Sequence, residues 1–358
     1  MNKPTIAVLG ATGFVGGQVL TALSRSGYRL RAGYRDRSIR WHVEEIKCEW
    51  LPMELERPAS VRRLVRGAQA VIHCAGYIPK RSQGIGEARR RGVARLRTVL
   101  DACQREEVRR VVYLSSAATT LQTGEMKNSP GAPIVDETSL YIPGSVEDSY
   151  VEAKAAMEAE LYRYIASGLE IVVALPTAAF GPGDVKGHTS RFIDAINSRG
   201  LASPKGLKVN ICDVRDLAQG VISALQRGRS GRRYLFGGNT IGYAEFVESI
   251  ARLSEIEMPR PTMTAAAIRS ARQLGERVGE PFDCAPLSTF QLPSELELRA
   301  QEVSSARATA ELGYHCRALD QTIIDTIRWC CRVGYLSWRP RRSMEFGFWR
   351  PQREALDR

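Results

Sequence analysis

The sequence lacks the features that mark membrane proteins, metal sites and disulfide-rich secreted proteins. Its 358 residues contain no uninterrupted apolar run of the roughly 18 residues that a membrane-spanning helix needs. The eight cysteines form no Cys-x-x-Cys pair and no cluster with the four histidines, which argues against zinc sites and disulfide frameworks. The first residues lack the apolar core of a signal peptide. We therefore expect a cytoplasmic protein without metal, whose thiols are buried or idle.

The sequence has fewer acidic residues than basic ones. Lysine and arginine number 51 against 39 aspartates and glutamates, which gives a formal net charge of +12. Such an excess can attract nucleic acid or an anionic membrane surface. The arginines are spread along the chain, however, and no nucleic-acid recognition motif accompanies them. We expect no nucleic-acid partner, and attribute the charge to attraction of an anionic cofactor or substrate.

The first half of the chain alternates short apolar runs with segments of helical apolar spacing. The composition, 44% apolar and 25% charged, is that of a globular protein. The expected strands are 5–9, 28–35, 48–55, 70–76, 108–116 and 170–177, and the expected helices are 14–26, 58–67, 87–105 and 149–167. This alternation predicts βαβ units and a parallel sheet. The expected fold class is α/β, a doubly wound parallel Rossmann sheet with a smaller, mostly helical C-terminal part.

Three glycines at three-residue spacing follow the first expected strand: Gly10, Gly13 and Gly16 in GATGFVG. A strand before them and a helix after them form the context of the dinucleotide-binding fingerprint. Gly10 permits the tight turn, Gly13 lets the helix N-terminus approach a pyrophosphate, and Gly16 allows close packing of helix and strand. The residues between them, Thr12, Phe14 and Val15, complete this part of the predicted cofactor site.

The end of the second expected strand indicates which cofactor binds. An acidic residue there binds a ribose hydroxyl of NAD, whereas an arginine accommodates the 2′-phosphate of NADP. The sequence places Arg35 and Arg37 at this point, with Arg40 close behind, which favours NADP. Asp36 keeps NAD open, because it becomes the ribose acid if the strand ends one residue later.

The pattern of strands and helices loosens after about residue 180. We expect a dinucleotide-binding domain over 1–178, with strand and helix contributions from about 207–240. A substrate-binding part then comprises 179–206 and 241–335. The tail, 336–358, alternates arginine with tryptophan and phenylalanine. Two interpretations of the tail stay open: it folds back on its own domain or a second copy, or it makes peripheral contact with an anionic membrane surface.

Tyr150 and Lys154 lie four residues apart at the start of one expected helix, so both side chains share a face. A lysine close to a tyrosine lowers the pKa of the phenol, which can then exchange a proton with an alcohol or carbonyl oxygen. The fifth expected strand ends in Ser115 and Ser116, beside the cofactor crevice of a parallel sheet. One of these hydroxyls can hydrogen-bond the substrate oxygen. We select Ser116, with Ser115 as the alternative.

Together, the motifs GATGFVG, HCAG, YLSSA, YVEAK and LPTAAFGPGD resemble the extended short-chain dehydrogenase/reductase superfamily over roughly residues 4 to 335. Within it, the branch that is dihydroflavonol-reductase-like and hopanoid-associated epimerase-like is most similar to this chain in RAGYRD, PTAAFGPGD and VSSARATAELGY. The resemblance implies a catalytic triad of Ser116, Tyr150 and Lys154, with the lysine also holding the nicotinamide ribose. It implies a homodimer through paired helices near 87–105 and 149–167. It adds to the cofactor site Cys74, Ala75, Gly76, Pro176 and Thr177.

Departures from the family pattern restrict the class of substrate that we expect. Gly92 stands where many members have asparagine, and Leu175 where the family has arginine. The asparagine and arginine that hold a diphosphate-linked sugar in nucleotide-sugar epimerases are missing from ALPTAAFG and KVNICDVRDLA, which argues against a UDP-sugar. The substrate pocket is expected from 77–83, 119–148, 178–200 and 262–279. Its mixed apolar lining favours a mid-sized apolar or aromatic ketone.

The leading hypothesis is therefore an NADP-dependent reductase or dehydrogenase that transfers hydride between the cofactor and a small-molecule ketone or alcohol. Two alternatives stay open. One is a redox-neutral epimerase or dehydratase that keeps its cofactor tightly bound, which differs in not consuming added cofactor. The other is a non-catalytic cofactor-sensing protein, against which the intact set of Ser116, Tyr150 and Lys154 argues.

Overall fold

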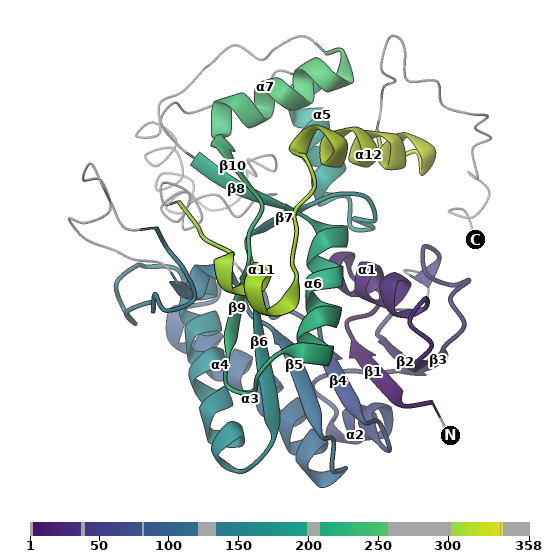
Figure 1. Ribbon diagram of the computed structural model, residues 1–358, viewed down its shortest axis with the longest axis vertical. Helices are drawn as coiled ribbons and strands as arrows, with labels where there is room; N and C mark the ends of the chain where they lie inside the picture. The colour runs from purple at the N-terminus through teal and green to yellow at the C-terminus, as the bar shows by residue number, and fades with distance from the viewer. Residues whose placement is uncertain are drawn as a thin grey trace.

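The computed structural model describes residues 3–36, 40–80, 82–120, 134–198, 208–256, 302–336 and 338. Within these residues, seven parallel strands form a large sheet (Figure 1). They are β1 (Thr5–Leu9), β2 (Arg29–Tyr34), β3 (Glu49–Pro52), β4 (Ala70–His73), β5 (Arg110–Leu114), β6 (Glu170–Pro176) and β9 (Arg233–Phe236). Their order is β3-β2-β1-β4-β5-β6-β9. The order reverses beside β1, and ligands of such sheets bind at that switch point, outside the carboxyl ends of the strands.

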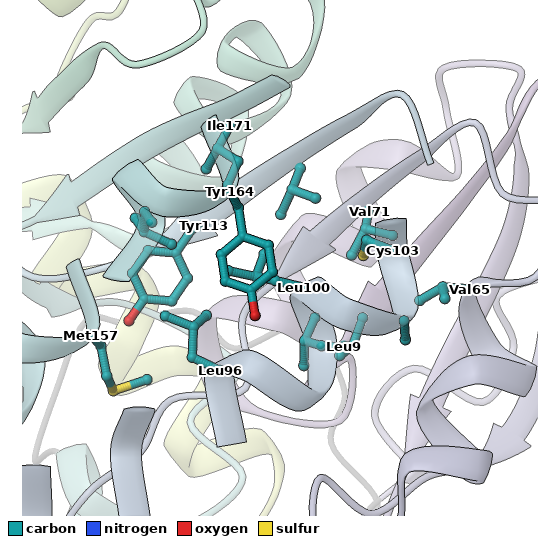
Figure 2. Packing of buried hydrophobic residues seen from close by; sticks show 14 of the residues in the cluster. Leu9, Val65, Val71, Leu96, Leu100, Cys103, Tyr113, Met157, Tyr164 and Ile171 are labelled. Carbon is teal, nitrogen blue, oxygen red and sulfur yellow. The ribbon is translucent and has the colours of Figure 1, made fainter. Parts of the chain in front are cut away.

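Helices cover both faces of the large sheet. One face packs against α1 (Phe14–Leu23), α6 (Val214–Arg227) and α11 (Ala306–Leu312), and the other against α2 (Pro58–Val65), α3 (Ile85–Arg105) and α4 (Ser149–Ala166). Figure 2 shows the second layer, in which Leu96 and Leu100 of α3 and Met157 of α4 lie against the strands. Strands covered on both sides read as continuous apolar runs, as β4 and β6 do.

The C-terminal part adds a small sheet beyond one end of the large one (Figure 1). Its elements are β7 (Ala178–Phe180), β8 (Lys208–Asp213), β10 (Asn239–Gly242), α5 (His188–Asn197), α7 (Tyr243–Ser254) and α12 (Leu319–Arg332). Phe180 and Phe246 meet edge to face at 5.4 Å in its core. Trp41, in the segment after β2, stacks on Trp329 of α12 with ring centroids 6.4 Å apart. This contact joins the C-terminal part to the cofactor end of the large sheet.

The predicted fold class, a doubly wound parallel sheet with a smaller C-terminal part, is confirmed. Helix α1 ends at Leu23, three residues before the predicted end, and Gly27 adopts a positive φ of 75° in the turn that follows. In the region 207–240, where strand and helix contributions are expected, β9 joins the large sheet and β8 the small one. Three predicted regions lie wholly or partly outside the described residues: the pocket segment 262–279, residues 121–133 of the pocket segment 119–148, and most of the tail. Across the residues that are described, no helix has the length and apolar character to cross a membrane.

Candidate active site

The turn between β1 and α1 is built from backbone that has no room for side chains. Gly10 has a φ of +77°, and a Cβ placed on it would lie 2.7 Å from the backbone nitrogen of Ala75. A Cβ on Gly16 would lie 2.0 Å from the carbonyl oxygen of Gly10. Real Cβ atoms do not approach other atoms so closely, so β1, α1 and the segment after β4 can meet only through glycine.

No side chain among the described residues caps the N-terminus of α1. Gly13 is its N-cap residue, and its backbone N–H donates to the carbonyl of Gly10 at 3.0 Å. The first turn of the helix therefore begins without a side-chain acceptor, and Thr12, Phe14 and Val15 around it are half-buried. Helix N-terminal N–H groups and the helix dipole together bind phosphate. The bare turn and the uncapped helix fit the pyrophosphate of a dinucleotide.

The other predicted cofactor residues that the structure describes follow neighbouring strands at the same edge. Cys74 and Ala75 are half-buried and Gly76 is exposed, directly after β4. Pro176 ends β6, and the Thr177 hydroxyl that follows lies 3.4 Å from the carbonyl oxygen of Phe236. Since the carboxyl ends of parallel strands share one edge, these residues lie on the same side of the sheet as the glycine turn.

Three arginines follow β2, and the structure separates their roles. Arg35 is exposed and makes no hydrogen bond or ion pair within the described part of the chain. Arg40 instead lies between the rings of Tyr34 and Trp50, each 5.2 Å away, and pairs with Glu44 at 3.0 Å. These contacts commit Arg40 to packing. Arg37 lies outside the described residues.

The structure brings Ser116, Tyr150 and Lys154 together. Asp148 caps α4 by accepting from the backbone N–H groups of Tyr150 and Val151 at 2.8 and 2.9 Å, which fixes the start of the helix. The buried Lys154 ammonium donates to the carbonyl of Leu114 at 3.3 Å, at the end of β5. Its Nζ lies 5.9 Å from the centre of the Tyr150 ring.

The two serines after β5 have different partners. The Ser116 hydroxyl accepts from the backbone N–H of Ala118 at 3.1 Å and also interacts with the phenol of Tyr150. The Ser115 hydroxyl is buried and donates to Glu158 at 2.8 Å. Ser116 is thus the serine that faces the tyrosine, whereas Ser115 is engaged inside the protein.

Burial is the largest influence on the pKa of both Tyr150 and Lys154. It raises the pKa of the Tyr150 phenol, and the interaction with Ser116 opposes this only in part. Burial lowers the pKa of Lys154 to about 8, against the attraction of Glu158. The lowered tyrosine pKa that the sequence predicts is therefore not found, because the lysine bonds to main-chain carbonyls and the buried phenol resists ionisation.

A buried ion pair beneath the site is absent from the sequence-based prediction. The Arg233 guanidinium lies 2.5 Å from a carboxylate oxygen of Glu158, and both side chains are almost fully buried. The signal available was the position of Glu158 one turn after Lys154 in YVEAKAAMEAE, on the same helical face. Nothing in the sequence near Glu158 points to Arg233, which comes from β9.

Large apolar side chains are exposed in two segments predicted to line the substrate pocket. Ile78, Leu140 and Ile142 keep 62%, 63% and 65% of their surface exposed. Ile78 follows β4 closely, and the other two belong to the segment before α4. Exposed apolar groups that gather on functional segments are typical of surfaces that bind apolar ligands.

Comparisons with known proteins agree with this geometry. The sequence profile of the family described as "NAD dependent epimerase/dehydratase family" matches residues 6–237. The "Putative dihydroflavonol 4-reductase" of Synechocystis sp. is 25% identical over 337 residues, which cover 92% of this chain and 95% of the relative. A ketoreductase of Stigmatella aurantiaca, named for a farnesylated dihydroquinoline oxide, is 26% identical over 90% of this chain and 95% of its own.

A solved structure described as a nucleoside-diphosphate-sugar epimerase from Pseudomonas aeruginosa is also similar. It has a TM-score of 0.77 and 26% identity, and the match covers 93% of this chain and 99% of that one. The expected superfamily is confirmed. The chain belongs to the NAD dependent epimerase/dehydratase family of extended short-chain dehydrogenases/reductases, and is an enzyme that uses a nicotinamide dinucleotide.

Proposed function

We propose that the protein is an NADP(H)-dependent oxidoreductase that interconverts an apolar small-molecule ketone and its alcohol. The observation that carries the proposal is the meeting of Ser116, Tyr150 and Lys154 at the strand edge that also holds the glycine turn. A proton donor, a hydroxyl and a buried cation beside a dinucleotide site are the groups that reduction of a carbonyl requires.

The proposed roles follow from the positions of the three side chains. The bound dinucleotide supplies or accepts the hydride. In reduction, Tyr150 donates its proton to the substrate oxygen, and in oxidation it takes the proton from the alcohol. Ser116 hydrogen-bonds the same oxygen as its charge changes. Lys154 holds the nicotinamide ribose, and its buried ammonium lies beside the Tyr150 ring. The raised tyrosine pKa suits a group that starts as the acid.

The preference for NADP rests on Arg35. It is exposed at the carboxyl end of β2, where the 2′-phosphate of NADP binds in this fold. Arg40 does not supply the same charge, because its guanidinium is held between two aromatic rings. The neighbouring Asp36 is also exposed, which is why the two cofactors have to be compared directly.

The apolar character of the substrate rests on the exposed side chains. Ile78, Leu140 and Ile142 present apolar surface on segments that are predicted to line the substrate pocket. Leu175, which stands where the family pattern has an arginine, is a buried apolar residue. The named substrate of the Stigmatella ketoreductase, which carries a farnesyl chain, supports the same class.

A redox-neutral epimerase is the second candidate, favoured by the similarity to the solved structure described as a nucleoside-diphosphate-sugar epimerase. Both reactions use the same cofactor, so the discriminating quantity is the net consumption of the cofactor.

The test mixes the purified protein with NADPH, and separately with NADH, and follows oxidation of the nucleotide with aromatic, terpenoid and sugar ketones. We expect oxidation with apolar ketones, and a higher kcat/KM with NADPH. Tight nucleotide binding without oxidation by any ketone would contradict the reductase proposal and favour the epimerase. Failure to bind either nucleotide would contradict the cofactor site itself.

A further inference from the structure

We propose that Glu158 and Arg233 are a positioning pair that fastens residues 134–148, here called the substrate loop, to the catalytic helix, and thereby holds Ser116 in place. This proposal rests on the proposed function for its catalytic consequence. Its structural part concerns only contacts among the described residues.

The Glu158 carboxylate binds one residue on each side of Ser116 along the chain. It accepts hydrogen bonds from the hydroxyls of Ser115 and Thr119, each at 2.8 Å. Ser115 directly follows β5, and Thr119 belongs to the short 3-10 helix Ala117–Thr120. Ser116 lies between these two bonds. One buried carboxylate on α4 thus fixes the backbone on either side of Ser116, four residues along the helix from Lys154.

The Arg233 guanidinium carries the connection onward to the substrate loop. It donates to the carbonyl and the hydroxyl of Thr119 at 3.0 and 2.9 Å. It also donates to the carbonyls of Glu137 and Ser139, both at 2.9 Å. The Glu137 carboxylate returns the contact by accepting from the backbone N–H of Leu235 at 2.8 Å. Strand β9 and the loop are therefore bonded in both directions.

A second buried carboxylate on α4 holds the next part of the loop. Glu152 accepts from the hydroxyl of Tyr141 at 2.6 Å and from the backbone N–H of Gly144. The anchored residues, Ser139 and Tyr141, alternate with the exposed Leu140 and Ile142. The anchors on one side of the loop thus fix where its apolar side chains are presented on the other.

Net stability does not explain such a pair. Removing two charges from water costs about as much as their attraction returns, so a buried ion pair contributes little beyond what apolar packing would give. The charged groups instead fix the geometry of the hydrogen bonds around them. The planar guanidinium reaches several acceptors in a fixed geometry, and here it joins β9, the 3-10 helix and the substrate loop to one carboxylate.

The test compares Glu158→Gln and Arg233→Met with the whole wild-type protein by hydrogen exchange, without substrate. We expect exchange within 134–148 to accelerate roughly tenfold or more in Arg233→Met, because local opening no longer breaks the loop anchors. The matched control is Arg97→Met, which removes an exposed ion pair with Glu160 of the same helix. It should leave exchange in the loop unchanged.

Kinetics supply the second readout. With an apolar ketone, both variants should lose kcat by roughly tenfold to a hundredfold, because misplacement of Ser116 affects the chemical step. The Kd for NADPH should not change, since the glycine turn is separate. Glu158→Gln with Arg233→Met should be no worse than the worse single variant, because the residues act as one unit.

Unchanged exchange in the loop of both variants would overturn the proposal. If Arg233→Met does not fold, Arg233→Lys, which keeps the charge and loses the fork, takes its place in the same comparison. Unchanged kcat in a variant whose loop exchanges faster would overturn the link to catalysis. An inactive wild-type protein would remove the proposed function, but the exchange result would still decide whether the pair anchors the loop.

Discussion

The two halves of the active site are held by different kinds of contact. The cofactor half is a backbone structure, in which glycines within seven residues of sequence let β1, α1 and the segment after β4 touch. The substrate half is a side-chain structure, in which Arg233 reaches Thr119 across 114 residues of sequence. The cofactor half depends on the absence of side chains at its glycines, and the substrate half depends on buried charged side chains. They should therefore fail in different ways when single atoms are added or removed.

Tyr150→Phe removes the proton donor and adds nothing, and should show the largest effect. We expect kcat to fall by roughly 10²–10⁴, the usual contribution of a general acid. The Kd for NADPH should stay the same. The control is Tyr162→Phe on the same helix, because Tyr162 is 51% exposed and has no proposed part in proton transfer. Steady-state kinetics and nucleotide fluorescence measure both quantities, and retained turnover in Tyr150→Phe would remove this residue from the mechanism.

Gly16→Ala adds one methyl group to the cofactor half. The new Cβ would lie 2.0 Å from the Gly10 carbonyl oxygen, so the turn has to move. We expect the affinity for NADPH to fall and the free energy of unfolding to drop by about 1–3 kcal/mol. Gly86→Ala in α3 should be neutral or slightly stabilising, because among the described residues the Cβ would meet only an arginine side chain, at 3.5 Å. Urea unfolding and calorimetric titration compare the two variants, and equal behaviour would show that the turn has room to spare.

Arg35→Ala tests the choice of cofactor. A charge-assisted bond to the 2′-phosphate contributes about 1.5–3 kcal/mol, so NADPH should bind about ten- to a hundredfold more weakly. Binding of NADH, which lacks that phosphate, should stay as it was. A loss of the same size for both nucleotides would assign Arg35 a general role and return Asp36 to consideration.

The pH dependence should reflect Lys154. Its pKa is lowered to about 8, so its charge is complete below that pH and lost above it. We expect the rate of ketone reduction to fall about tenfold between pH 7 and 9, following the loss of that charge. Between about 8 and the ordinary value of 10.5, the unfolded chain binds more protons than the folded one. The contribution of Lys154 to the free energy of unfolding therefore rises with pH in that window. In Lys154→Arg, which stays charged, the same fall in rate would contradict this assignment.

The same contrast explains what the sequence could predict. The turn of Gly10, Gly13 and Gly16 and the pairing of Tyr150 with Lys154 are set by neighbours in sequence, so spacing alone indicates them. The partner of Glu158 comes from β9, and only the folded sheet brings the two together. The direction of the Tyr150 pKa was mispredicted for the same reason, because burial is a property of the whole fold. Local sequence spacing was therefore enough to predict the glycine turn, whereas the Glu158–Arg233 pair and the Tyr150 pKa depend on long-range packing.

The proposed reductase activity is tested most directly by comparing the amount of cofactor oxidised with the amount of product formed. The wild-type protein is incubated with NADPH and an apolar ketone, and the alcohol formed is compared with the NADPH oxidised, with Tyr150→Phe alongside. In the wild type we expect equal amounts of both, and in Tyr150→Phe about a hundredfold less of each, or lower still, in the same time. Conversion of substrate without net oxidation of NADPH would contradict the account and identify a redox-neutral enzyme on the same site.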